Sequence, residues 1–101
     1  RVWPALAHRV PGFDHARLLD TWAGHYEVNT LDHNAIVGPH PRIHNLLFAN
    51  GFSGHGLQQA PAAGRGLAEW IAMGRWQTID LSPLGYERVE RDEPIRELNV
   101  V

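Results

Sequence analysis

One stretch, residues 46–74, constrains the fold of this chain more than any other. Its first four residues, 46–49, are apolar without polar alternation, which is typical of a strand buried on both faces. A glycine-rich loop follows, and from Leu57 onward the apolar residues recur at helical spacing. Pro61 fits only near the first turn of such a helix, and Gly74 is a suitable C-terminal stop. The stretch therefore predicts a strand, a loop and a helix in that order.

The loop in this stretch, Gly51-Phe-Ser-Gly-His-Gly56, suits the binding of an electron-rich group. A helix start leaves free backbone N–H groups and a partial positive charge, and glycine lets a ligand approach the backbone closely. An electron-rich oxygen of a cofactor could sit there, although a tight structural turn explains the same pattern equally well. A phosphate-binding P-loop is excluded, because its spacing does not fit and the chain contains no lysine.

Composition limits the other classes of function. The 101 residues are enough for one small domain, and a hydrophobic content of 44% argues against disorder. A net charge of -2 gives no reason to expect nucleic acid or an anionic membrane as partner. The absence of cysteine excludes disulfides, thiolate nucleophiles and Cys-based zinc sites. Because neither a membrane-spanning segment nor a secretory signal is visible, we expect a cytoplasmic protein, and the opening on Arg1 suggests a piece of a longer one.

The remaining residues predict short elements on either side of the central stretch. Residues 1–10 place Trp3, Leu6 and Val10 on one face of a short helix. Residues 18–28 alternate like a strand, and residues 35–38 predict a second, brief strand before a proline-containing loop.

Later in the chain, Ser82 and Pro83 resemble the start of another helix. The charge-rich residues 87–97 indicate a solvated surface. Earlier in the chain, Asp32 is predicted to be a turn residue. No linker divides the chain, so we expect a single unit.

Residues 51–58, Gly-Phe-Ser-Gly-His-Gly-Leu-Gln, resemble the C-terminal flavin motif of the D-amino-acid-oxidase-like family, which includes sarcosine oxidases and dimethylglycine dehydrogenases. The resemblance extends over residues 18–101 and implies a mixed α/β fold. The chain would be the C-terminal part of the FAD-binding and substrate domains, without the N-terminal Gly-x-Gly-x-x-Gly unit. Within one segment, 1–101, it would divide into substrate-domain strands, a flavin strand–loop–helix and a C-terminal tail: 18–45, 46–74 and 75–101.

The resemblance also implies a function and a cofactor site. The parent enzyme would use FAD to oxidise a C–N bond of a small amine or amino acid. The loop would lie along the pyrimidine side of the flavin ring, and its N–H groups would stabilise negative charge at N1 and the C2 carbonyl oxygen. The implied cofactor-binding residues are Gly51, Phe52, Ser53, Gly54, His55, Gly56, Leu57 and Gln58.

Single positions carry further implications of the resemblance. His55 and Tyr26 would be catalytic, and Tyr26 and Gln58 would bind substrate. Sarcosine oxidases carry at position 58 a lysine that helps to hold the substrate carboxylate, whereas Gln58 brings no charge. Monomeric sarcosine oxidases tether the flavin through a cysteine two residues before the active-site tyrosine. Gly24 stands there in this chain, so we expect FAD to be held without a covalent bond to this segment.

In this family FAD is held mainly by the N-terminal dinucleotide fold, which these residues lack. We therefore expect the 101 residues alone to be inactive and to bind FAD weakly. The remainder of the parent enzyme would then be a partner of this segment. Exposed apolar surface would favour docking onto that remainder or self-association, and it would include some of the four tryptophans, Trp3, Trp22, Trp70 and Trp76.

Other functions fit the sequence less well. A non-catalytic interaction domain could use the glycine-rich loop to bind a partner. A histidine-based metal site would have to use pairs such as His40 and His44, but neighbouring prolines disfavour the helical geometry, so we expect no metal. A hydrolase built on Ser53 and His55 lacks the Gly-x-Ser-x-Gly spacing of a nucleophile elbow.

Overall fold

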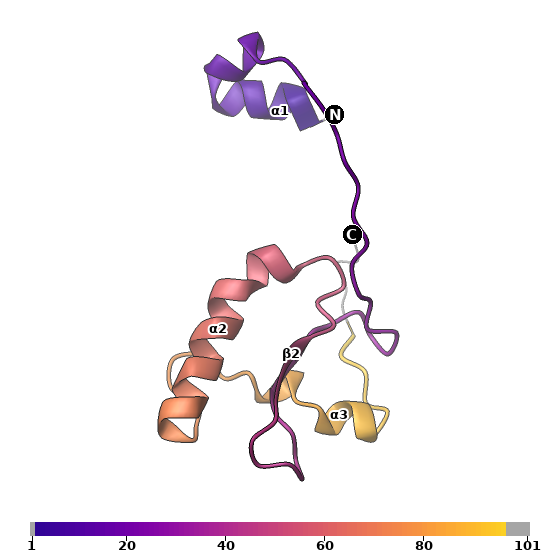
Figure 1. Cartoon of the computed structure of the whole chain (residues 1–101), viewed down its shortest axis with the longest axis vertical. Coiled ribbons are helices and arrows are strands. Elements are labelled where there is room, and N and C mark those ends of the chain that lie inside the picture. Colours follow the sequence, from indigo (N-terminus) through magenta and orange to yellow (C-terminus); the bar gives the residue numbers. More distant parts are fainter. Residues whose placement is uncertain (1, 97–101) are drawn as a thin grey trace.

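The computed structural model describes residues 2–96 and shows a small mixed α/β fold, in agreement with the predicted class. A short two-stranded sheet lies beside one long helix, and an N-terminal helical pair stands apart at the end of an extended segment (Figure 1). The elements are α1 (Val2–Arg9), η1 (Pro11–His15), β1 (Ile36–Pro39), β2 (Leu47–Asn50), α2 (Gly56–Met73), η2 (Ser82–Leu84) and α3 (Glu87–Glu90).

The two strands form an antiparallel hairpin in which Ile36 lies opposite Asn50 and Pro39 lies opposite Leu47. Residues 40–46 connect the two strands. The backbone N–H of His40 donates to the carbonyl of Leu46 (2.9 Å) and closes this loop. Its imidazole Nδ1 accepts two backbone N–H bonds from the turn, at 3.0 and 3.2 Å. The predicted strand at 35–38 is therefore confirmed with a shift of one residue.

The strand predicted at 46–49 exists, but the prediction that both its faces are buried is wrong. Leu47 and Phe48 are half-buried, whereas Ala49 and Asn50 are exposed. β2 pairs with β1 along one edge, and the described part of the chain provides too few elements to cover both of its faces. The apolar run therefore remains partly in contact with solvent.

The strand predicted at 18–28 is wrong for a related reason. These residues are extended but unpaired, apart from an isolated bridge between Val28 and Phe52. Leu19 and Trp22 are 94% and 93% exposed. A strand needs a neighbour to satisfy its backbone groups, and among residues 2–96 none lies alongside this segment.

α2 confirms the predicted helix and its stop at Gly74, which adopts a left-handed φ of 69° and donates its N–H to the carbonyl of Trp70 (2.8 Å). The placement of Pro61 in the first turn is wrong, because the helix begins at Gly56 and Pro61 is its sixth residue. Pro61 has no N–H to offer the carbonyl of Leu57, but Leu57 lies at the exposed helix start, where water can take the place of that donor.

The core lies between α2, β1 and the chain that follows α2. It consists of four buried apolar residues and the partly buried side chains packed on them: Ala35, Val37, Ala63 and Leu81 with Phe52, Leu67, Trp76 and Leu84. Gly66 brings α2 close, since a Cβ there would lie 2.5 Å from Cδ1 of Leu81. The predicted start at Ser82 and Pro83 forms only one 3₁₀ turn, η2, whose N-cap position is Leu81 rather than Ser82 and lacks a side-chain capping bond.

A buried ion pair joins the turn before β1 to α3. Nη1 of Arg88 lies 3.1 Å from Oδ2 of Asp32, and the two side chains are 7% and 1% exposed. Nη2 of Arg88 donates to the carbonyls of Asn34 and Ala35 at 3.2 and 2.9 Å. Oδ2 of Asp32 also accepts the N–H of Ile95 at 2.9 Å.

This ion pair corrects one prediction and extends another. Asp32 lies in a turn as predicted, but its carboxylate is buried. The prediction that residues 87–97 form a solvated surface is wrong for Arg88, because its guanidinium has buried partners in the turn that contains Asp32. Glu97 lies outside the described residues.

A second buried carboxylate fixes the chain after α2. Glu69 accepts the hydroxyl of Thr78 at 2.7 Å and the backbone N–H groups of Gln77 and Thr78, each at 3.0 Å. Nε of Arg65 donates to it at 2.6 Å. The hydrogen bond from the Thr78 hydroxyl, and then the one from its N–H, lower the pKa of Glu69 from 4.5 to about 2.

Removing the cation of the buried pair should destabilise the fold strongly. Arg88→Met leaves the carboxylate of Asp32 buried without a counter-ion, so we expect a loss of about 3–5 kcal/mol in the free energy of unfolding. Urea unfolding followed by tryptophan fluorescence measures this loss. Arg91→Met is the control, because Arg91 is exposed and 3.9 Å from Glu93, and should change stability by less than about 1 kcal/mol. Equal losses in the two variants would contradict a structural role for the buried pair.

The carboxylate of Glu69 should make stability depend on pH. Because its folded-state pKa of about 2 lies below the ordinary 4.5, its contribution is fully present above about pH 4.5 and is lost as the pH falls toward 2. Glu69→Gln should therefore unfold at a lower temperature at pH 7 and show a flatter dependence between pH 4.5 and 2. Thermal unfolding across this range tests it, with Glu93→Gln as an exposed control. Parallel profiles for wild type and Glu69→Gln would refute the assignment.

Candidate functional site

The loop between β2 and α2 has an unusual backbone. Gly51, Ser53 and Gly54 adopt φ angles of 69°, 50° and 91°, all in the region that L-residues rarely occupy. Phe52 forms the bridge with Val28, and the N–H of His55 donates to the carbonyl of Phe52 at 2.9 Å. The glycines are therefore required by the conformation of the loop, which turns the chain sharply into the helix.

Residues upstream of the sheet hold this loop in place. The hydroxyl of Ser53 accepts the N–H of Asn29 at 2.9 Å and donates to the carbonyl of Gly51 at 3.2 Å. A carboxylate oxygen of Glu27 accepts the N–H of Phe52 at 3.4 Å. A Cβ on Gly51 would lie only 3.2 Å from Cβ of Asn29, so a side chain at this position would disturb the contact.

Asn29 also connects the loop to the buried ion pair. Its amide Nδ2 donates to Oδ1 of Asp32 at 3.1 Å and to the carbonyl of Asn34 at 2.7 Å. Its Oδ1 accepts the N–H of Leu31 at 3.1 Å. Sequence reasoning identified Asp32 as a turn residue but missed the role of Asn29 and Glu27 in supporting the loop. The available signal was the cluster of Asn and Asp, residues that bond to nearby backbone in turns.

Tyr26 lies against the same loop. A Cβ on Gly54 would be 3.2 Å from Cζ of Tyr26 and 3.4 Å from its hydroxyl oxygen. The tyrosine itself is 65% exposed, so its ring covers Gly54 while its other side remains accessible. The structure thus brings together Tyr26 and the glycine loop, two predicted site features that are far apart in the sequence.

The first turn of α2 presents unpaired donors beside this loop. The first helical hydrogen bond runs from the N–H of Gln59 to the carbonyl of His55 at 3.1 Å. The N–H groups of residues 56–58 precede it and therefore lack an acceptor within the helix. The N-cap, His55, makes no side-chain capping bond within the described chain. These donors and the positive end of the helix can receive an electron-rich oxygen.

The predicted side chains at the helix start differ in their surroundings. His55 is half-buried, whereas Leu57 and Gln58 are exposed. Among the described residues, Gln58 makes no side-chain hydrogen bond and is not joined to Tyr26. The structure therefore places Tyr26 against Gly54. Among the described residues, no hydrogen bond fixes the orientation of the Gln58 side chain.

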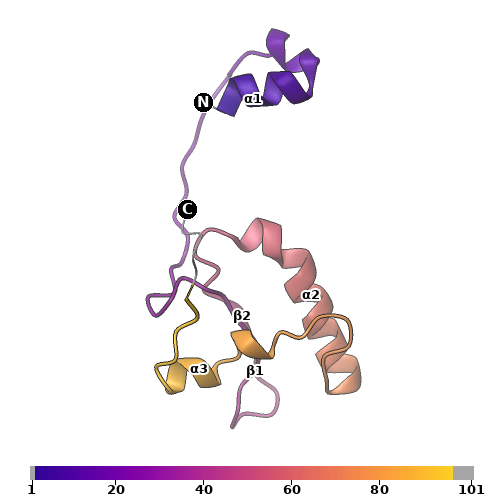
Figure 2. The same cartoon turned by 180° about the vertical axis from the view of Figure 1, so that it is seen from behind.

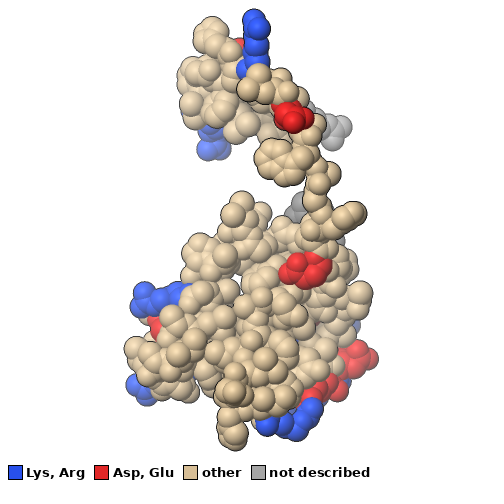
Figure 3. Space-filling model, viewed as in Figure 1, with Lys and Arg blue, Asp and Glu red and all other residues tan. Residues whose placement is uncertain are grey.

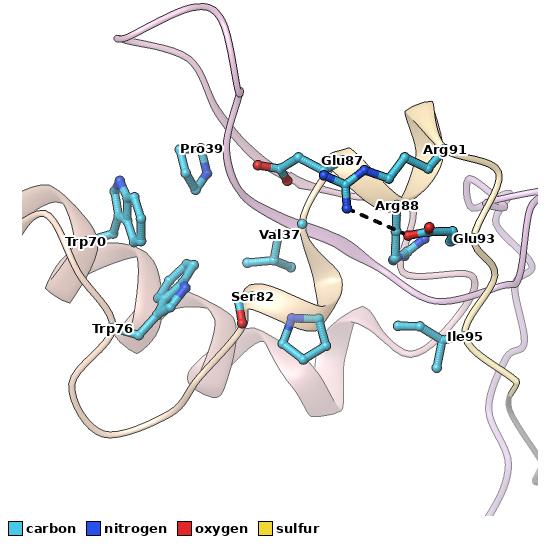
Figure 4. A pocket seen from close by; sticks show the side chains of 12 residues that line it. Val37, Pro39, Trp70, Trp76, Ser82, Glu87, Arg88, Arg91, Glu93 and Ile95 are labelled. Carbon is cyan, nitrogen blue, oxygen red and sulfur yellow. Dashed lines mark ion pairs between the residues drawn. The ribbon is translucent and has the colours of Figure 1, made fainter.

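A separate cavity of about 530 Å³ lies between β1, the end of α2 and α3, and it contains none of the predicted site residues (Figure 4). Val37 lies at its floor, and the indoles of Trp70 and Trp76 form one wall with ring centroids 4.8 Å apart. Arg91 and Glu93 face each other at the other end (Figure 4). Sequence reasoning missed this cavity, because its walls come from segments that are distant in sequence.

One of the two histidines considered for a metal site, His40, has structural partners in the described chain. His40 stacks on Tyr86 with ring centroids 5.4 Å apart, and its Nδ1 is occupied by two backbone N–H groups. Among residues 2–96, no three His, Asp or Glu side chains are grouped closely enough to hold a metal ion.

Comparison with known proteins places this arrangement in a family. The family model described as "FAD dependent oxidoreductase" matches residues 1–70. The chain is 50% identical over 101 residues to the FAD-dependent oxidoreductase domain-containing protein 1 of Xenopus laevis, covering 100% of the chain and 20% of that protein. The protein of the same name from Bos taurus is 53% identical over 97 residues, covering 96% of the chain and 20% of that protein.

Human peroxisomal sarcosine oxidase is 38% identical over 60 residues, which are 59% of this chain and 15% of that protein. No solved structure matches significantly. The chain thus spans about a fifth of the length of the first two relatives. Because the family model covers residues 1–70, most of the chain, we conclude that this chain belongs to the family of FAD-dependent oxidoreductases.

Proposed function

We propose that the full-length protein uses FAD to oxidise a C–N bond of a small amine or amino acid, and that residues 51–58 contact the flavin ring. One observation carries this proposal: a glycine loop covered by Tyr26 opens directly onto the unpaired N–H groups of α2. Family membership supports FAD as the cofactor. Similarity to a protein named peroxisomal sarcosine oxidase supports an amine substrate.

The residues present fit the pyrimidine edge of a flavin. That edge is flat and carries electron-rich oxygen and nitrogen atoms, so it needs a surface without side chains and with hydrogen-bond donors. Gly54 and Gly56 add no side chains of their own beside Tyr26 and Phe52, and the N–H groups of residues 56–58 provide the donors. We propose that these N–H groups stabilise the negative charge that develops at this edge. FAD, when bound, supplies the two-electron acceptor.

Two side chains would act on the substrate side. Tyr26 is 65% exposed, and its hydroxyl can donate or accept a hydrogen bond. His55 is half-buried at the helix start, and its imidazole can donate or accept a hydrogen bond. We propose that this pair positions the amine and exchanges its proton.

The hydrogen bonds beneath the loop would preorganise these groups. Ser53 is held by Asn29, and Asn29 is held by Asp32, whose carboxylate is fixed by Arg88. N–H groups that are already oriented need not reorganise when charge develops, which is where fixed dipoles are most effective. The Gly24 position gives no thiol for a flavin bond, so we propose that FAD is non-covalent with respect to this segment.

The decisive experiment uses the full-length protein and Gly54→Ala. Wild type should purify with bound flavin that absorbs at about 450 nm. Acid precipitation should release this flavin, and an N-methyl amino acid should reduce it under anaerobic conditions. Gly54→Ala should lose most of this flavin, because alanine is strained at a φ of 91° and its Cβ would press on the ring of Tyr26. Absorbance per mole of protein measures the loss.

Gly12→Ala is the matched control, because its Cβ would meet nothing within 4 Å and Gly12 does not have a positive φ. It should retain flavin as wild type does. A full-length protein without flavin would favour the interaction-domain alternative. Full flavin in Gly54→Ala would show that the ring does not contact this loop.

Gln58→Lys tests the substrate side. Gln58 is exposed at the helix start and uncharged, so a lysine there would add a cation beside the donors of the first turn. In the full-length enzyme we expect KM to fall more for carboxylate-bearing amines than for neutral amines, by about tenfold if one partly buried charge-assisted bond forms. Steady-state kinetics on matched substrate pairs measures the difference. Equal changes for both classes would remove Gln58 from the substrate site.

A further inference from the structure

The cavity between β1, the end of α2 and α3 has no role in the proposed flavin site, although its size suits a ligand. Its volume of about 530 Å³ lies within the roughly 300–1,000 Å³ typical of small-molecule sites. Its lining includes neither Tyr26 nor any of residues 51–58. In two opposite views α2 and α3 lie on opposite sides of the hairpin, and both helices contribute walls (Figures 1 and 2). The cavity is therefore a candidate binding site separate from the glycine loop.

Two indoles form the wall of this cavity at the α2 end. The ring planes of Trp70 and Trp76 are tilted by 49°, with the centroids 4.8 Å apart. Trp76 is held from two sides, because a Cβ on Gly38 would lie 3.3 Å from its Cζ2 and a Cβ on Gly66 would lie 3.3 Å from its Cζ3. β1 and α2 thus fix this ring in the cavity wall. Among aromatic side chains, indole attracts a cation most strongly.

The carboxylate of Glu87 enters the same cavity. The side chain is half-buried, and Figure 4 shows it extending from α3 toward Pro39 and the indoles. A Cβ on Gly85 would lie 2.7 Å from Oε2 of Glu87, so the missing side chain at Gly85 leaves room for this carboxylate. Within residues 2–96, Glu87 forms neither an ion pair nor a side-chain hydrogen bond. A partly buried carboxylate of this kind is stabilised when a cation reaches it.

The other charges around the cavity already have partners. Arg88 is paired with Asp32 at 3.1 Å, and Arg91 lies 3.9 Å from Glu93. At the α3 end of the body, acidic and basic side chains lie beside one another (Figure 3). Nε of Arg88 is buried without a hydrogen-bond partner in the described chain, and a water molecule can accept from it. The negative charge of Glu87 is thus the one that these pairs leave uncompensated.

We propose that this cavity binds a small organic ammonium ion, with the charged nitrogen between the indoles of Trp70 and Trp76 and the carboxylate of Glu87. The carboxylate supplies the opposite charge, and the indoles supply cation–π attraction and apolar contact with the carbon substituents on the nitrogen. A metal ion is a poorer occupant, since no three His, Asp or Glu side chains are grouped to hold one in the part of the chain that the structure describes. An alkylated ammonium needs no such set of oxygen ligands. Because the cavity shares no residue with the flavin loop, this binding is independent of the proposed oxidation.

Equilibrium dialysis of the full-length protein against radiolabelled tetramethylammonium chloride tests this proposal. The nitrogen of this probe has no lone pair, so the probe is not oxidised as an amine and binding is measured without turnover. Sodium chloride holds the ionic strength constant. We expect saturable binding of one ion per chain, which an equal concentration of tert-butanol, a neutral molecule of similar shape, does not displace.

Variants of the two walls identify the site. Glu87→Gln removes the charge and should raise Kd at least about tenfold. Trp70→Leu should raise Kd by about fivefold, and Trp70→Phe, which keeps an aromatic ring, should raise it less. Glu90→Gln is the control, because Glu90 lies on the same helix, pairs with Arg42 and does not line the cavity. It should bind the probe as wild type does.

Thermal unfolding checks that each variant is folded, and the variants at opposite walls do not share a folding defect. The absence of saturable binding to the full-length protein would overturn the proposal. An unchanged Kd in Glu87→Gln, or displacement by an equal concentration of tert-butanol, would also overturn it. Binding in a preparation that carries no flavin, weakened in Glu87→Gln, would uphold this site while rejecting the proposed function.

Discussion

The ion pair between Arg88 and Asp32 is the interaction on which the rest of the described structure depends. It fixes the short helix α3 to the turn before β1, although the core above it has only four buried apolar residues. Asp32 in turn orients Asn29, and Asn29 orients Ser53 in the glycine loop. A small apolar core cannot by itself hold a loop in a conformation with positive φ angles. Buried polar contacts therefore stabilise that loop conformation.

Local patterns predicted local structure well. The apolar run before the loop, the helical spacing after it and the left-handed Gly74 all act through neighbouring residues, and each appears where it was predicted or within a residue or two. The strand predicted at 18–28 failed because pairing needs a partner, which its own residues cannot provide. The buried Arg88 could not be predicted for the same reason, since its partner Asp32 lies in a turn that is distant in the sequence.

The candidate site shows the same division. Residues 51–58 and Tyr26 follow from the resemblance to flavoenzymes, and the contact between Tyr26 and Gly54 agrees with it. Glu27 and Asn29 were not predicted, because hydrogen bonds from side chains to a distant backbone leave no periodic trace in the sequence. The glycines of residues 51–56 did indicate, from the sequence, a backbone that a planar ligand can approach closely.

The extended segment before Val28 has one further consequence. Its backbone donors and acceptors form an unpaired edge beside strongly exposed side chains such as Leu19 and Trp22. Edges of this kind recruit other extended chains, which is the usual first step of aggregation. A protein that keeps such a segment must protect it during synthesis, either by rapid pairing with another strand or by a chaperone. The aggregation risk of this polypeptide is therefore set by this edge and not only by the stability of the core.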